Sequence, residues 1–303
     1  MEIISRQGDP ELAEVFVARF RGNDRFLVEF VDARDPDVPA HEKWVVIVST
    51  QFGCPVACAM CDAGGEYHGG LSAEEILSQV EHVVSRSSAD RLASVLKFKV
   101  QFARMGEPAL NPAVLDALRL LPGRFNAPGL IPCVATVAPS SAAPWFEELL
   151  SIRRNVYGGR PFQLQLSINS TDDAARDRLM PVPKMSLREL GAYAIRFSGH
   201  GPRKVSLNFA MARGMAIDPG VVARHFDPAS ACVKITPLNP TIRSAEQGLK
   251  SGLEACIPED VDEIMREFGR LGFDVILSIG DARENSIGSN CGMAVRKIKG
   301  EVR

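Results

Sequence analysis

Three cysteines, Cys54, Cys58 and Cys61, lie within eight residues of one another in the stretch QFGCPVACAMCDAGGEYHGG. A thiolate is both a metal ligand and a nucleophile, so three of the chain's seven cysteines on one short segment indicate metal binding or catalysis. The C-x-x-x-C-x-x-C spacing differs from zinc sites, which usually combine paired cysteines into four ligands. A cubane [4Fe–4S] cluster normally takes four thiolates, so a set of three would leave one iron open for chemistry. A structural zinc or iron–sulfur module is the alternative.

The rest of the composition is that of a globular protein with a sizeable core, in one large domain or two modest ones. The 303 residues are 46% hydrophobic and 24% charged, with a net charge of −2. The polar N-terminus MEIISRQGDPELAE does not have the pattern of a secretory signal, and no apolar run reaches the ~18 residues of a membrane span. We therefore expect a cytoplasmic protein with reduced thiols and no membrane partner. Lys and Arg are scattered, which does not favour a wholesale grip on a nucleic-acid backbone but leaves a local basic face open.

The elements that must position the cysteines form an alternating pattern. Apolar runs at Glu14–Phe20 and Arg25–Ala33, joined by RGND, predict a β-hairpin. A strand over Trp44–Thr50 follows, and strands and helices then alternate, which predicts a parallel sheet. We expect an α/β fold: a partial (β/α)6 TIM-type barrel over 44–303, ending in a C-terminal cysteine loop, preceded by a small N-terminal β extension, the hairpin, over 1–43. In parallel barrels the chemistry gathers at the carboxyl ends of the strands, where the first cysteine segment lies.

The cysteine spacing after the first barrel strand resembles the signature of the radical S-adenosylmethionine (SAM) enzymes. RMGEPALN, at Arg104–Asn111, is similar to the GEP motif of that family. The stretches STQFGC, MGEPALN, SIN…RDRLMPVPK, ITPLNPT and ENSIGSNCG occur in the order found in the RlmN/Cfr-type class A methyl synthases. Those enzymes methylate adenine carbons of ribosomal or transfer RNA. The resemblance runs from about Leu27 to Gly292 as scattered motifs.

This resemblance implies two cofactors, a [4Fe–4S] cluster and SAM. Cys54, Cys58 and Cys61 would bind the cluster, whose free iron would chelate SAM so that an electron splits it to a 5′-deoxyadenosyl radical. Asn169 stands where the family has a histidine, and Thr136 is adjacent to Ala135, where the family has a serine. The residues that the resemblance assigns to SAM binding are Met60, Gly106, Glu107, Thr136, Ser167, Ile168, Asn169 and Asn239.

Cys291, in the motif GSNCGM, matches the family cysteine that accepts a methyl group from a first SAM. Only a thiolate is nucleophilic enough for that step. Glu29 matches a family glutamate assigned as a proton acceptor, although on a hairpin strand an ordinary solvated glutamate is the alternative. Ile47 stands where the family has a second, resolving cysteine. Cys133 and Cys232 lie on predicted barrel strands and are expected to be buried structural cysteines, with substitution for the missing second cysteine as the alternative.

The resemblance does not extend to the family's N-terminal helical domain that engages RNA, and we expect the protein to work without it. Together with the near-neutral charge, this favours a small-molecule or peptide substrate and disfavours a large folded RNA. We therefore expect a methyl synthase that works through Cys291 on a non-ribosomal substrate, with a flavodoxin- or ferredoxin-type reductant. Three alternatives stay open: a hydrogen-abstracting radical SAM enzyme without methyl transfer, an RNA adenine-carbon methyltransferase, and a non-catalytic iron–sulfur or zinc module.

Overall fold

The computed structural model describes residues 1–303 except 36, 254–258, 281–282, 284–286, 288–291 and 301–303. Its contacts group the chain into two units. The first comprises Met1–Ala57, Cys61–Ala135 and Ala282–Arg303, and the second comprises Cys58–Met60 and Thr136–Asp281. Among the described residues, no helix is both long and apolar enough to cross a membrane.

The first unit is built on antiparallel strands that continue into parallel ones. Strands β1 (Glu2–Asp9), β2 (Ala13–Arg19), β3 (Leu27–Ala33) and β4 (Lys43–Val48) pair antiparallel in that order. Strands β5 (Lys97–Phe102) and β6 (Leu130–Thr136) then extend β4 in parallel. The predicted hairpin is confirmed as β2 and β3. It is incomplete, however, because β1 adds a third strand whose side chains are all at least partly exposed, so the sequence offers no apolar run to reveal it.

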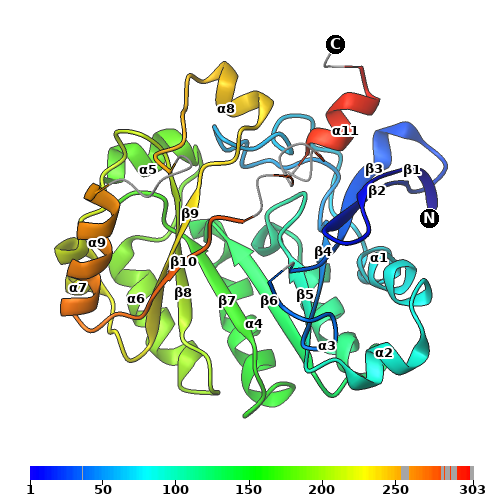
Figure 1. Ribbon diagram of the computed structural model, residues 1–303, viewed down its shortest axis with the longest axis horizontal. Helices are drawn as coiled ribbons and strands as arrows, with labels where there is room; N and C mark the ends of the chain where they lie inside the picture. Colours follow the sequence, from blue (N-terminus) through cyan, green and yellow to red (C-terminus); the bar gives the residue numbers. More distant parts are fainter. Residues whose placement is uncertain (36, 254–258, 281–282, 284–286, 288–291, 301–303) are drawn as a thin grey trace. The chain divides into compact units, whose positions relative to one another are not determined.

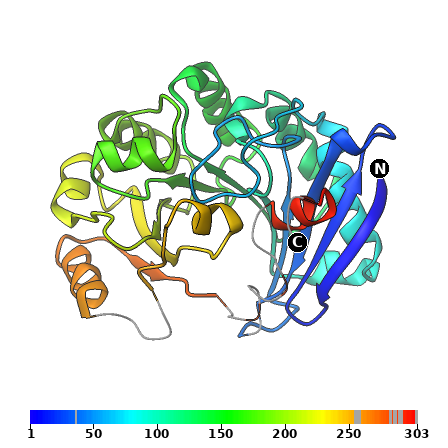
Figure 2. The ribbon, with the colours of Figure 1, turned by 90° about the horizontal axis from the view of Figure 1, so that it is seen from above.

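Short helices cover this unit. They are α1 (Ala73–Ser85), α2 (Ala89–Ser94), α3 (Ala113–Phe125) and α11 (Met293–Ile298), with 3₁₀ turns η1 (Asp24–Phe26) and η2 (Pro108–Leu110). Helix α1 begins at a capping box, in which Ser72 and Glu75 each accept a hydrogen bond from the other's backbone N–H. Helix α3 packs on α1, and α11, drawn in red, lies against β2 and β3 (Figures 1 and 2).

The second unit is a parallel α/β arrangement. Strands β7 (Gln163–Ser167), β8 (Val205–Met211), β9 (Ala231–Pro237) and β10 (Val275–Leu277) pair in chain order. Helix α6 packs against β8 and β9, and α7 lies between α6 and α9 (Figure 1). The helical segments are η3 (Ser140–Ala142), α4 (Ala143–Asn155), α5 (Asp173–Leu179), α6 (Leu187–Ser198), α7 (Pro219–His225), α8 (Ile242–Glu246) and α9 (Glu259–Arg270).

The predicted α/β class is therefore confirmed, as a mixed fold with ten strands among the described residues. The division into a (β/α)6 barrel and the boundary at residue 43 stay predictions. In each unit the sequence motifs fall where parallel strands end. Ser49 follows β4, Ala103 follows β5, and Ile168 follows β7.

Candidate active site

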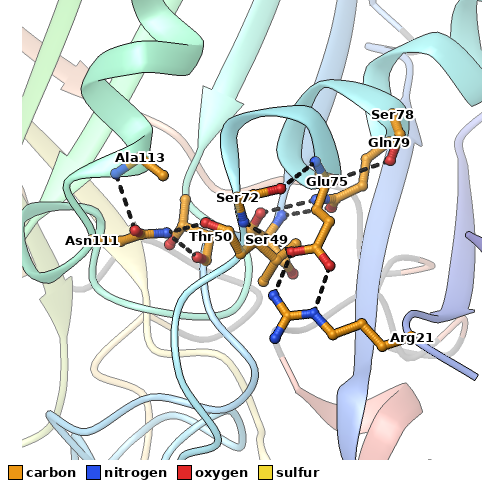
Figure 3. Close-up of polar contacts among 10 residues, drawn as sticks. Arg21, Ser49, Thr50, Ser72, Glu75, Ser78, Gln79, Asn111 and Ala113 are labelled. Atoms are coloured by element: carbon orange, nitrogen blue, oxygen red, sulfur yellow. Dashed lines mark hydrogen bonds and ion pairs between the residues drawn. The ribbon is translucent and has the colours of Figure 1, made fainter. Parts of the chain in front are cut away.

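The segment Ser49–Gln51 follows β4. Side chains donate and accept hydrogen bonds at its backbone groups, as a neighbouring strand would in a sheet. The amide group of Gln79, on α1, accepts a hydrogen bond from the backbone N–H of Ser49 at 2.9 Å and donates one to its carbonyl at 3.0 Å (Figure 3). The Ser49 hydroxyl donates to the carbonyl of Glu29 at 2.5 Å and accepts from Met105 N at 3.1 Å. Ser49, Thr50 and Gln51 are buried, so water does not reach their backbone N–H and C=O groups, and protein groups provide their hydrogen bonds instead.

The GEP loop after β5 is attached directly to this segment. The carbonyl of Met105 accepts from the backbone N–H of Thr50 at 2.7 Å, and Glu107 N donates to the Gln51 side chain at 2.8 Å. Gly106 has φ +101°, and a Cβ there would lie 2.6 Å from the Gln51 Cβ and 2.7 Å from the Thr50 hydroxyl oxygen. The glycine of the motif is thus required both by backbone conformation and by close approach.

Asn111, the last residue of the motif, joins three parts of the chain. Its side-chain N–H groups donate to the carbonyls of Thr50 at 2.7 Å and Leu71 at 2.8 Å, while its oxygen accepts from Ala113 N at 3.1 Å (Figure 3). The sequence pattern alone indicates no further role for Asn111, because an Asn-Pro pair before a helix is ordinary capping chemistry. In the fold it holds the ends of β4, the start of α1 and the GEP loop together.

Cys54 lies on a tightly folded loop next to this framework. Gly53 has φ +78°, and a Cβ there would lie 1.6 Å from the carbonyl oxygen of Glu66. Burial raises the pKa of the Cys54 thiol to about 12, the nearby Cys61 adds to this, and the backbone N–H of Val56 opposes it by donating to the sulfur. Two predicted cluster ligands, Cys54 and Cys61, therefore lie within electrostatic reach of each other.

This donor set suits an iron–sulfur cluster better than a hard metal ion. It consists of soft sulfur groups, and a backbone N–H already donates to one of them. Binding a metal would deprotonate that thiol despite its raised pKa, because the metal replaces water as the partner of the charge. In the described part of the chain, no three His, Cys, Asp or Glu side chains are arranged as a ready metal site. Cluster binding by Cys54, Cys58 and Cys61 stays a prediction.

In the second unit, hydrogen bonds to its backbone hold the segment Cys58–Met60 in place. Ala59 N donates to the carbonyl of Leu179 at 2.9 Å. The hydroxyl of Thr241 donates to the Met60 carbonyl at 2.9 Å and also accepts from Ser244 N, at 3.0 Å, as the N-cap of α8. Thr241 belongs to the motif ITPLNPT, but no role was predicted for it. Its signal was a threonine directly before a helix.

Asn169 stands where the family has a histidine, and its side chain is engaged inside the second unit. Its oxygen accepts from Ala210 N at 3.0 Å, and its nitrogen lies 3.3 Å from the sulfur of Met180. Asn169 has φ +60°, a left-handed conformation that asparagine tolerates better than most residues. These contacts clamp the end of β7 to β8, and the predicted contact of Asn169 with SAM is untested.

The other predicted SAM residues of this unit also lie at strand ends. Thr136 ends β6, and its hydroxyl oxygen accepts from Ala138 N at 2.9 Å. Ser167 ends β7 opposite Asn208, and the buried Ile168 follows it. Asn239 follows β9, and its carbonyl accepts from Thr241 N at 2.8 Å. Each of them lies at or just after the carboxyl end of its strand, and their roles stay predictions.

Glu29 is fully buried, so the alternative interpretation as a solvated glutamate is wrong. Its carboxylate accepts from the backbone N–H groups of Gly292 at 2.5 Å, Ala294 at 2.9 Å and Val295 at 3.1 Å. Its Oε1 also lies 2.6 Å from a guanidinium nitrogen of Arg104. The charge is thus satisfied from two directions, which is what allows a carboxylate to be buried on a strand.

These contacts place the residue that follows Cys291, which itself lies outside the described residues. Gly292 has φ +87°, and a Cβ there would lie 2.2 Å from Ala63 N and 2.3 Å from the carbonyl carbon of Asp62. Farther along α11, Arg296 donates to the Asp62 carboxylate at 3.1 Å. The chain after Cys291 is therefore pressed against the residues after Cys61, two motifs more than two hundred residues apart in sequence.

Comparisons with known proteins agree with these motifs. The chain is 30% identical over 297 residues to a probable dual-specificity RNA methyltransferase RlmN of Frankia alni, and 29% identical over 296 residues to one of Frankia casuarinae. The matches cover 94% and 93% of this chain, which spans 65% and 64% of the length of those relatives. The chain is thus similar in sequence to proteins named RlmN over nearly all of its own length. The resemblance that the motifs indicated is thereby confirmed.

The fold of this chain is similar to that of a solved structure. The crystal structure of a radical SAM methyltransferase from Sphaerobacter thermophilus matches it with a TM-score of 0.73 at 20% identity, covering 96% of this chain and 80% of that one. At this identity the likeness shows the fold. No protein-family model matches the chain.

The structure gives the positions of Ile47, which stands where the family has a second cysteine, and of two cysteines outside the first cysteine segment. Ile47 lies in β4, paired with Val31 on one side and Gln101 on the other. Cys133 and Cys232 are buried in β6 and β9, as predicted, and burial raises the pKa of the Cys232 thiol. A thiol with a raised pKa is mostly protonated near neutral pH, which suits a packing role better than exchange chemistry.

Proposed function

We propose that this chain is a radical SAM methyltransferase that works through Cys291. One observation carries the proposal: Gly292 is packed on Asp62 and Ala63, directly after the predicted cluster ligand Cys61. A Cys291 that served as an incidental surface thiol would need no such anchor. The kinship with proteins named RNA methyltransferases supports the same reaction type.

We propose that Cys54, Cys58 and Cys61 hold a [4Fe–4S] cluster. Together with SAM, the bound cluster would supply a 5′-deoxyadenosyl radical. The role of the protein residues is to hold the two cofactors in a fixed position relative to each other. Gly106 lets the GEP backbone lie flat against Gln51, and the buried framework of Asn111 keeps that loop rigid. A rigid support of this kind reduces the reorganisation that a reactive intermediate would otherwise require.

Cys291 is proposed to accept a methyl group as a thiolate and to present it to the substrate. Glu29 is proposed to position Cys291. Its carboxylate already accepts three backbone N–H groups from the chain after Cys291 and pairs with Arg104, so it acts as a tether for that segment. The family role of a proton acceptor stays a prediction for Glu29.

An adenine-containing RNA is the substrate class to test first, because relatives matching more than nine-tenths of the chain are named RNA methyltransferases. The expectation of a small-molecule or peptide substrate rests on the net charge of −2 and remains the competing proposal. A flavodoxin- or ferredoxin-type protein is the proposed source of the electron.

A second function is favoured by one residue. Ile47 can neither form a disulfide nor exchange a proton, so a methyl-transfer cycle that resolves its adduct through a second thiol is not available at that position. Direct hydrogen abstraction from the substrate, without methyl transfer, needs no resolving cysteine.

The decisive experiment is anaerobic incubation of cluster-loaded protein with SAM and dithionite. We expect a methylated peptide containing Cys291 by mass spectrometry, together with S-adenosylhomocysteine. Cys291→Ala should abolish both while keeping the cluster absorbance. Formation of 5′-deoxyadenosine with neither a methylated Cys291 peptide nor S-adenosylhomocysteine would reject methyl transfer and favour the second function.

The substrate is tested in parallel with synthetic adenosine-containing RNA and [methyl-²H₃]SAM. Labelled C-methyladenosine after nuclease digestion would support an RNA substrate. Its absence, with methylated Cys291 still present, would exclude the tested RNA and leave methyl transfer intact.

A further inference from the structure

A polar cavity lies in the first unit, away from the cysteine loop. It has a volume of about 290 Å³ and is lined by β1–β3 and the turn between α1 and α2. Its neighbour Trp44 is near the start of β4, whereas the cysteine segment follows the end of that strand, roughly 16 Å along it. The charged lining residues are Arg6, Glu14, Asp32, Arg34, Arg86 and Arg91.

The charges in this cavity do not balance. Glu14, nearly buried, pairs with both Arg6 and Arg86. Asp32 is buried as well, and it accepts from the indole N–H of Trp44 at 2.7 Å. Four guanidinium groups therefore face two carboxylates, an excess of two positive charges among the residues that line the cavity.

Arg91 is the least satisfied of the four. Its guanidinium lies 4.1 Å from the centroid of the Trp44 ring, and one nitrogen reaches the Ser87 hydroxyl at 3.3 Å. Its Nε and second terminal nitrogen are buried, with no hydrogen-bond partner among the described residues. A buried N–H donor without a hydrogen bond costs free energy, so a bound acceptor at these two nitrogens would stabilise the site.

Arg34 is a second arginine of the cavity whose positive charge is only weakly compensated. Its guanidinium pairs with the carboxylate of Glu11 at 3.7 Å, on a side chain that is 86% exposed and therefore strongly screened by solvent. Burial and the charge of Arg34 both lower the pKa of Arg91, with Asp32 opposing them. Two like charges thus lie close enough to repel each other where a small anion could separate them.

We propose that this cavity binds a phosphate group. Phosphate offers several oxygens to two planar guanidinium forks, and its second negative charge matches the excess of two. The stacking of Arg91 on Trp44 fixes one fork in advance, which lowers the entropy cost of binding. The cavity exceeds the size of one phosphate, so the group can be carried on a larger ligand, either a free nucleotide or an RNA strand.

The site is independent of the proposed reaction, because none of its charged residues belongs to the predicted cluster or SAM sets. The test is isothermal titration of cluster-loaded full-length protein with potassium phosphate, against potassium chloride at equal ionic strength. We expect saturable binding of one phosphate. Arg91→Gln and Arg34→Gln should each weaken it at least tenfold.

Arg124→Gln is the matched control, since Arg124 is a partly exposed arginine on α3 that pairs with Glu74 and Glu81. It should leave phosphate binding unchanged. Arg34→Gln removes a partly exposed side chain and guards against a folding defect in the Arg91 variant. Deoxyadenosine formation should be normal in the Arg34 variant, which touches no predicted cofactor residue.

Two further titrations identify the carrier. AMP binding that is lost in Arg91→Gln would point to a nucleotide, and displacement of phosphate by an unphosphorylated ten-nucleotide RNA would point to a backbone phosphate. The proposal is overturned if neither phosphate, AMP nor RNA binds saturably, or if both arginine variants bind them as the unaltered protein does.

Discussion

Glu29 and Arg104 form a buried ion pair, with 2.6 Å between the carboxylate and guanidinium atoms and side chains that are 0% and 5% exposed. One residue lies in β3 and the other follows β5, and the same carboxylate receives the N-terminal N–H groups of α11. A single buried charge therefore joins the N-terminal strands, the GEP loop and the chain after Cys291.

Glu29→Gln should destabilise the protein by about 3 to 5 kcal/mol, because it leaves the Arg104 guanidinium buried without its counter-charge. Urea unfolding measures the loss. The exposed pair of Arg196 and Glu147 provides the control, and Glu147→Gln should cost little because solvent screens that pair. Equal losses in the two variants would contradict a special role for Glu29.

Gly106→Ala should lower SAM affinity at least tenfold and destabilise the chain. The added methyl group meets Gln51 and Thr50, and φ +101° is strained for alanine. Gly123→Ala is the control, because a Cβ at that helical position meets nothing within 4 Å. That variant should be slightly stabilised. Equilibrium dialysis with labelled SAM reports the affinity, and unchanged binding in Gly106→Ala would refute the role of the loop.

Thr241→Val should make the proposed cluster more labile to oxygen. The variant loses the N-cap of α8, worth about 1 kcal/mol, and also the hydrogen bond to the Met60 carbonyl within the cysteine loop. Ser186→Ala removes a comparable cap from α6. The rate at which the 400-nm-region absorbance decays in air should rise in the first variant but not in the second.

Stability should fall as the pH drops through His82's unperturbed pKa of 6.5. Burial, followed by the charges of Arg86 and Arg6, lowers the pKa of His82 in the folded chain, with Glu14 opposing them. The unfolded chain therefore takes up a proton first, so the contribution of His82 is present above pH 6.5 and is lost below it. His82→Leu should flatten the melting temperature between pH 7 and 5, whereas His41→Gln, at an exposed position, should keep the slope.

Local patterns identified much of the fold. The hairpin of β2 and β3 and the capping boxes at Ser72 and Ser186 were predictable because each depends on neighbours in sequence. Strand β1 was missed because an edge strand needs no continuous apolar run. Thr241 and Asn111 were missed as supports, because their partners Met60 and Leu71 lie far away in the chain.

The sequence alone determined the chemistry that is available: the cysteine spacing, the GEP motif and the order of motifs that marks an RlmN relative depend only on residue type and separation. Tertiary structure decided what those residues contact. It buried Glu29, pressed Gly292 against the residues after Cys61, and left Arg91 with unmatched donors beside Arg34. The physical reason is that burial and charge balance are set by side chains from distant segments, and a linear pattern carries no record of which of them meet.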